Sequence, residues 1–180
     1  MTILAELPKL VRYLLGKRSE LEDLDVKDAV MAKAILDIHR LRTRKELVTV
    51  PLYSLRQIHR LDRENAIVAT RRRVEALQSH RPALVAAGTL TCETLAEVLP
   101  SVSWIKAVRK GPQEYLAFEG NGRIAAMQAV FKPEDGMAVE IELYCFRNPK
   151  PIIRRLDRVR RMNGLLGKQP LRDSIATKPD

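Results

Sequence analysis

The segment 115–127 limits what this chain can fold into, because a predicted strand in it runs directly into a glycine turn and a predicted helix. The strand reads Tyr-Leu-Ala-Phe-Glu, the turn is Gly120-Asn121-Gly122-Arg123, and Ile-Ala-Ala-Met follow. The first N–H groups of a helix have no intrahelical acceptor and lie at the positive end of the helix dipole. Strand, glycine turn and helix in this order therefore predict a candidate anion site.

The segments around this turn switch between helical and alternating hydrophobic spacing. Helical spacing predicts a helix that ends at Gly16 and further helices over about 25–42, 66–87, 124–131 and 150–163, with a break at Pro82 and a stop at Gly88. Thr94 and Glu97 have the spacing of a capping box. Alternation predicts an edge strand from Leu47, because Pro51 lies within it, and a second strand over 139–145. Residues 104–119 predict a hairpin with a loop of about five residues, so the fold class expected is α+β.

The charge is concentrated at one end of the chain. The 180 residues carry a formal net charge of +10, yet residues 147–180 alone hold 10 basic and 3 acidic residues, a net charge of +7. We therefore divide the chain into an N-terminal helical extension (1–46), a central domain (47–146) and a basic C-terminal arm (147–180). Such an arm is typical of a segment that meets an anionic surface.

The composition excludes several classes of protein. The two cysteines, Cys92 and Cys145, lie far apart and the three histidines have no partner at ligand spacing, so no structural zinc, metal site or disulfide framework is predicted. No apolar run has the roughly 18 residues that a membrane span needs. Glu6 and Pro8 interrupt the start of the chain, where a signal peptide would be basic and then apolar. We expect a cytoplasmic protein.

The residues of the glycine turn suggest phosphate chemistry. Gly120 and Gly122 would let the backbone approach a phosphate, and the forked guanidinium of Arg123 suits phosphate oxygens. Glu119 could hold a metal, orient a hydroxyl or act as a general base. A plain tight turn, with Glu119 and Arg123 as a local ion pair, explains the same residues. Gly120-x-Gly122-x-x-Ala125 also fits a relaxed dinucleotide fingerprint, although the chain after Cys145 has no further strand for a doubly wound sheet.

Four segments in order resemble the ParB/sulfiredoxin superfamily. They are Thr49-Val-Pro-Leu-Tyr-Ser-Leu, then Arg73-Val-Glu-Ala-Leu to Gly88, then Ile105-Lys-Ala-Val-Arg109, and then Phe118-Glu-Gly-Asn-Gly-Arg123-Ile-Ala-Ala. The resemblance covers about residues 47–146. It implies a ParB-like domain with a small mixed sheet and flanking helices.

The resemblance also implies a function and a set of residues. Gly120, Asn121, Gly122 and Arg123 match the family's phosphate loop, Glu119 holds the position of its acidic residue, and Arg109 ends the strand that carries a ligand-binding arginine. The implied ligand is a nucleotide or a phosphorylated small molecule. The resemblance does not identify a cofactor, but a nucleotide with Mg²⁺ would fit such a site. Phosphoryl transfer or hydrolysis would depend on Glu119 and a divalent ion.

Departures from the family narrow this expectation. Sulfiredoxins carry their reactive cysteine where this chain has Asn121, so sulfinic acid reduction is not expected. Chromosome-partitioning members follow the domain with a helix-turn-helix region, and only 34 residues follow position 146 here. The sequence therefore resembles a free-standing version of the domain. The oligomeric state and the pathway are not predicted.

Arginines outside the turn give the alternative. In the helix over 150–163, Arg154, Arg155, Arg158 and Arg161 lie off the apolar face and could follow nucleic-acid phosphates, which would make the protein a non-catalytic nucleic-acid-binding protein. Two other roles of this helix stay open: its basic face could simply be solvated, or it could contact an anionic membrane. Arg71-Arg72-Arg73 is placed at the opening of a helix, where cations are disfavoured, and so could face phosphate. Arg60 and Arg63 are weaker candidates for the same role.

Overall fold

The protein is an α+β fold in which helices cover both faces of a six-stranded mixed sheet. The computed structural model describes residues 26–99 and 102–166. The strands are β1 (Arg44–Pro51), β2 (Leu55–Gln57), β3 (Thr89–Leu90), β4 (Ile105–Gly111), β5 (Glu114–Glu119) and β6 (Ala138–Cys145). The helices are α3 (Val26–Leu41), α4 (Glu64–Ser79), α5 (Arg81–Ala87), α6 (Cys92–Val98), α7 (Asn121–Val130) and α8 (Lys150–Met162), with single turns η2 (Leu52–Ser54) and η3 (Pro133–Asp135).

The sheet has the order β1-β6-β4-β5-β2. β3 pairs with Ala138 and Val139 of β6 on the side opposite β1, next to the part of β6 that pairs with β4. β1 with β6 and β4 with β5 are antiparallel pairs, whereas β4 with β6 and β2 with β5 are parallel. Since β4 lies between them, β5 and β6 run in opposite directions. A dinucleotide fold needs two parallel strands joined by the helix that follows the glycine turn, so this topology overturns the dinucleotide interpretation.

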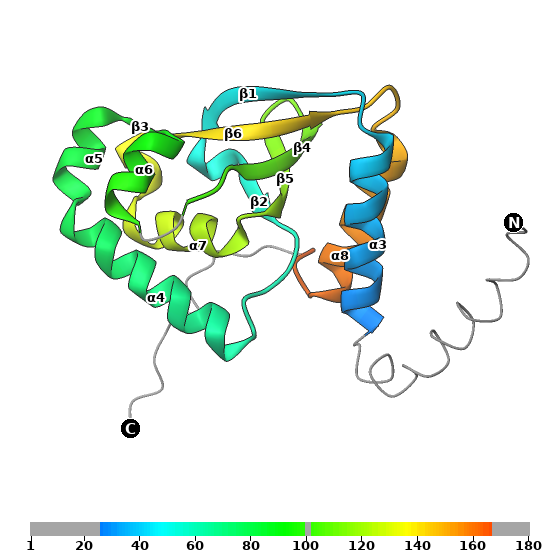
Figure 1. Cartoon of the computed structure of the whole chain (residues 1–180), viewed down its shortest axis with the longest axis horizontal. Helices are drawn as coiled ribbons and strands as arrows, with labels where there is room; N and C mark the ends of the chain where they lie inside the picture. The colour runs from blue at the N-terminus through cyan, green and yellow to red at the C-terminus, as the bar shows by residue number, and fades with distance from the viewer. Residues whose placement is uncertain (1–25, 100–101, 167–180) are drawn as a thin grey trace, which may run out of the picture.

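The two faces of the sheet bury separate cores. In β5, Tyr115 and Ala117 point into the core under α4–α7, while Leu116 and Phe118 point into the core under α3 and α8. Figure 1 shows these two helical layers on opposite sides of the strands. Burial on both faces explains why β5 is apolar at consecutive positions.

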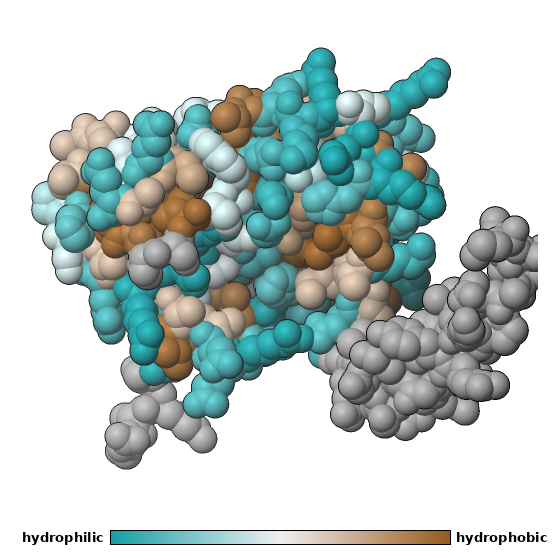
Figure 2. Space-filling view, in the orientation of Figure 1, coloured by the Kyte–Doolittle hydropathy of each residue, from teal (hydrophilic) through white to brown (hydrophobic). Residues whose placement is uncertain are grey.

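The segments predicted as a helical extension and a basic arm meet in one layer. Ala34 and Ile38 of α3 pack with Ile152, Leu156 and Val159 of α8 in the second core. Figure 1 shows α3 and α8 side by side, and Figure 2 shows one apolar area over the position of α3 and another over the position of α5 and α6. The helix predicted to end at Gly16 lies outside the described residues.

Most predicted elements are confirmed, with local corrections. β1 lies at the edge of the sheet but begins at Arg44, three residues earlier than expected, and the β4–β5 loop is Pro112-Gln113 rather than five residues. Glu97 has no capping role: Thr91 caps α6, and its hydroxyl accepts a hydrogen bond from the Thr94 N–H at 3.1 Å. Among the described residues no helix has the length and hydrophobicity of a membrane span.

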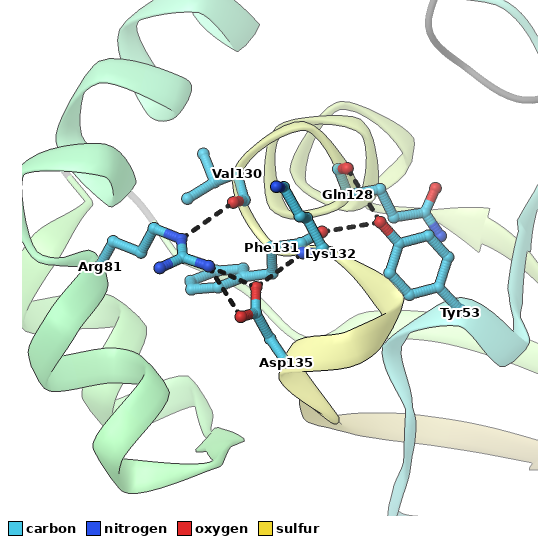
Figure 3. A network of polar contacts seen from close by, with 7 residues as sticks. All are labelled: Tyr53, Arg81, Gln128, Val130, Phe131, Lys132 and Asp135. Carbon is cyan, nitrogen blue, oxygen red and sulfur yellow. Dashed lines mark hydrogen bonds and ion pairs between the residues drawn. The ribbon is translucent and has the colours of Figure 1, made fainter.

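A polar network fixes the C-terminal end of α7 (Figure 3). The Arg81 guanidinium donates to both carboxylate oxygens of Asp135, at 2.7 and 2.6 Å, and to the Val130 carbonyl at 3.3 Å. Asp135 also accepts the Lys132 N–H at 2.7 Å, and the Tyr53 hydroxyl donates to the Phe131 carbonyl at 2.7 Å. The network therefore joins α5, the end of α7, η3 and η2.

Asp135 should make stability depend on acid pH. The Lys132 N–H, and then Arg81, lower the pKa of this carboxyl group. A lowered folded-state pKa adds stability above the unfolded value of about 3.9, and that stability is lost as pH falls through the folded value. Asp135→Asn should therefore be less stable than wild type at pH 7 in urea titrations, with the difference shrinking below about pH 4. Glu134→Gln, at an exposed neighbouring acid, is the control; equal stability of Asp135→Asn and wild type at pH 7 would contradict the network's role.

Candidate anion site at the start of helix α7

Gly120 makes the turn from β5 into α7 possible. Its φ of +92° is one that glycine adopts readily, and its carbonyl accepts the N–H groups of Arg123 and Ile124, each at 3.0 Å. A Cβ at this position would lie 2.9 Å from Ile105 Cγ1 and 3.3 Å from Ile105 Cα. Contact with β4 and a left-handed backbone therefore both require a glycine here.

Gly122 is small because α4 packs against the first turn of α7. A Cβ at Gly122 would lie 3.1 Å from Thr70 Oγ1 and 3.3 Å from Arg73 Nη1. The sequence argument gave both glycines the task of letting backbone approach a phosphate. The structure shows instead that packing against neighbouring residues limits the size of the side chain at both Gly120 and Gly122. It also places the Arg73 side chain beside the start of α7.

Asn121 faces the protein interior. Its side-chain Oδ1 accepts the Ile58 N–H at 3.0 Å, and its backbone carbonyl accepts Gln57 Nε2 at 3.0 Å. The side chain is buried. Asn121 therefore ties the end of β2 to the start of α7, and its side-chain oxygen and backbone carbonyl both accept hydrogen bonds from the protein itself.

Arg123 is the unusual residue of the site, because its guanidinium is buried and only partly satisfied. The residue is 8% exposed, and its Nη2 donates to Ser103 Oγ at 3.0 Å. Its Nη1 is buried and has no hydrogen-bond partner in the part of the chain that the structure describes. Burial, and after it the like charge of Arg73, lower the pKa of Arg123, whereas Glu119 and Cys92 act in the opposite direction. A guanidinium stays charged in proteins, so the site holds a buried cation with a free donor.

Arg73 adds a second cation to the same place. It has no acidic partner within residues 26–99 and 102–166. The prediction that Arg71–Arg73 opens a helix was wrong, because α4 begins at Glu64 and these arginines lie in its middle. Packing of α4 on α7, and not a helix terminus, brings Arg73 to Arg123. Of the weaker candidates, Arg63 pairs with Asp28 and Arg60 donates to the Gly164 carbonyl at 3.2 Å.

Glu119 lies beside the site but is paired elsewhere. Its Oε2 is 2.7 Å from Lys106 Nζ, and 43% of its side chain is exposed. Its charge still acts on Arg123. The alternative explanation of the turn, a local ion pair between Glu119 and Arg123, is wrong, because Glu119 forms a cross-strand pair with Lys106. No three His, Cys, Asp or Glu side chains gather as a metal site in the described ranges.

Arg109 lies away from this cluster. It is paired across the hairpin with Tyr115, and its guanidinium carbon lies 5.4 Å from the centre of that ring. Gly120 follows the opposite end of β5, five residues on, which is roughly 17 Å along a strand. The cluster that the structure assembles is therefore Arg123 and Arg73, with Glu119, Lys106, Ser103 and Cys92 around them.

The arginines predicted for nucleic acid divide into two groups. Arg155 Nη1 lies 3.4 Å from Asp37 Oδ2 of α3, so it takes part in packing between the helices. Arg154, Arg158 and Arg161 are exposed. A further arginine of this helix, Arg160, is buried beside Asp157 and Glu114, at 3.6 Å from each.

Comparison of the chain with protein-family models, curated proteins and solved structures finds no match. The resemblance to the ParB/sulfiredoxin superfamily therefore stays a prediction.

Substitution of the two glycines should separate their roles. Gly120→Ala should lower the free energy of unfolding by about 2 kcal/mol or more, because it combines a positive φ with contact against the Ile105 backbone. Gly122→Ala should cost less, since the Arg73 and Thr70 side chains can shift and alanine favours the helix by about 1 kcal/mol. Urea denaturation of both variants measures this, and a larger loss for Gly122→Ala would contradict the packing described here.

Proposed function

We propose that the protein binds a nucleotide or a phosphorylated small molecule at the start of α7, between Arg123 and Arg73. The observation that carries the proposal is the Nη1 atom of Arg123, which is buried and has no hydrogen-bond partner among residues 26–99 and 102–166. The residue is 8% exposed and lies next to Arg73, which has no acidic partner among the described residues.

Energetics favour an anionic ligand at this place. A buried charge without a partner costs several kcal/mol, and two neighbouring guanidinium groups add repulsion to that cost. A phosphate oxygen would accept from Nη1 and neutralise both cations through short, charge-assisted hydrogen bonds. The cluster of Arg123 and Arg73 is therefore more stable with a bound anion than without one.

The backbone of α7 adds to the same field. The N–H groups of Asn121 and Gly122 precede the first hydrogen bonds of the helix, so they have no acceptor within it. The positive end of the helix dipole lies there too. Arginines and helix terminus together supply the donors that phosphate recognition uses.

Glu119 is the residue we propose for any phosphoryl transfer or hydrolysis, with a divalent ion such as Mg²⁺ carried by the nucleotide. Such reactions depend on positioning and charge neutralisation more than on covalent chemistry by the protein. The Glu119 carboxylate is held in an ion pair with Lys106, so it is less available to accept a proton from a substrate. The geometry therefore favours ligand binding over general-base catalysis. Binding is accordingly the central part of the proposal.

Calorimetric titration with CTP, ATP and ADP, each with and without Mg²⁺, tests the proposal. Wild type should bind at least one of them, and Arg123→Ala should weaken binding by about tenfold to a hundredfold, the value of a charge-assisted hydrogen bond of about 1.5–3 kcal/mol. Arg73→Ala should weaken it to a similar degree, through loss of the second cation.

Arg109→Ala is the matched control, since it removes an arginine from the other end of β5. It should leave nucleotide affinity unchanged, and circular dichroism should show all three variants folded. Absence of binding by wild type, or equal affinity of wild type and Arg123→Ala, would overturn the proposal.

A further inference from the structure

Four cations form a straight stripe along α8, on the side that faces away from the core. Lys150, Arg154, Arg158 and Arg161 are exposed and follow one another at intervals of four, four and three residues. At 3.6 residues per turn these positions fall within an arc of about 80°, over roughly 17 Å of helix. The buried residues Ile152, Leu156 and Val159 occupy the opposite side of the same helix.

We propose that this cationic stripe, Lys150, Arg154, Arg158 and Arg161, binds the phosphate backbone of duplex nucleic acid. The surface is separate from the site at the start of α7, because α8 and α4–α7 cover opposite faces of the sheet (Figure 1). The protein would then bind two anionic partners, nucleic acid on α8 and a phosphorylated ligand at the start of α7, on opposite faces of the sheet.

The acids around α8 do not cancel the charge of the stripe. Asp157, the acid within the helix, lies 3.0 Å from Lys110 Nζ and is also beside Arg160, and Glu114 lies 3.6 Å from Arg160. Asp37 of α3 is surrounded by Lys33, Arg40 and Arg155. None of the four stripe residues has an acidic partner in the described part of the chain. Their charges are therefore available to a partner molecule.

The position of the apolar residues favours nucleic acid over a membrane. An amphipathic helix on a lipid surface buries its apolar face in the bilayer, with aromatic or leucine side chains as anchors. In α8 that face is used by the protein, since Ile152, Leu156 and Val159 are each at most 1% exposed. The exposed side of α8 therefore presents the cationic stripe, which can contact the closely spaced phosphates of a duplex.

Electrostatic contacts with the backbone would show little preference for sequence. Arginine and lysine contacts to phosphate position a protein, whereas base-edge contacts specify sequence. Single strands are bound chiefly by stacking on aromatic rings, and only 4% of this chain is aromatic. We therefore expect duplexes to bind more tightly than single strands, with affinity set by salt.

The test is fluorescence anisotropy with a labelled DNA duplex of about 20 base pairs, with an RNA duplex in a parallel series. With four phosphate contacts, wild-type affinity should fall by roughly a hundredfold between 50 and 200 mM NaCl. Arg154→Gln/Arg158→Gln should reduce the slope of log affinity against log salt by about two. Arg154→Lys/Arg158→Lys should keep the wild-type slope, because it keeps the charges.

Arg71→Gln/Arg72→Gln is the matched control, since it removes the same charge from exposed positions on α4 and should leave duplex affinity near wild type. All variants should retain the wild-type melting temperature, because these side chains lie outside the cores. Failure of wild type to bind duplex would overturn the proposal. So would equal effects of the two glutamine variants, or tighter binding to phosphatidylserine vesicles than to duplex.

Discussion

Strand β6 is the element on which the rest of the structure depends. It pairs with β1, β4 and β3, and thereby joins the edge of the sheet, the hairpin and the short strand that precedes α6. Val139, Ile141 and Leu143 point into one core, and Tyr144 lies in the other. Because one strand holds three neighbours and contributes to both cores, the helices before and after the sheet pack as two layers of one structure.

The sequence predicted local structure well where one residue pattern was sufficient. The alternation in 139–145 marked β6 to within one residue, and the glycine turn at 120–122 marked a helix start, although α7 begins at Asn121, three residues before the predicted helix of 124–131. The start of β1 was missed because Arg44, Lys45 and Glu46 are charged. Their place in the sheet depends on pairing with β6, where Lys45 Nζ lies 2.8 Å from Glu142 Oε1. Tyr144 shares the alternating side of this strand with Glu140 and Glu142, so local spacing alone does not place it in a core. Its burial is explained by the layer that α3 and α8 form.

The candidate site was predictable in position but not in its chemistry. Strand, glycine and helix start indicated an anion site from local spacing alone. The neighbourhood of Arg123 depends on α4, which supplies Arg73 from 50 positions earlier, and no local pattern in the sequence predicts that these two arginines lie near each other. The same packing leaves little room beside Gly122, and contact with β4 together with a positive φ requires Gly120, so both glycines attributed to a ligand have an explanation in the fold itself.

The central claim is that Arg123 is kept as a buried cation for a ligand and not for stability, and its most direct measurement is the unfolding free energy of Arg123→Met without ligand. Replacing even a buried ion pair by apolar side chains of similar volume is often neutral or stabilising by about 1–4 kcal/mol, and a buried charge without a partner has less to lose. We therefore expect the variant to be at least as stable as wild type in urea denaturation. A loss of about 3 kcal/mol or more, as when a satisfied buried ion pair is broken, would show that the protein itself compensates Arg123 and would contradict the account.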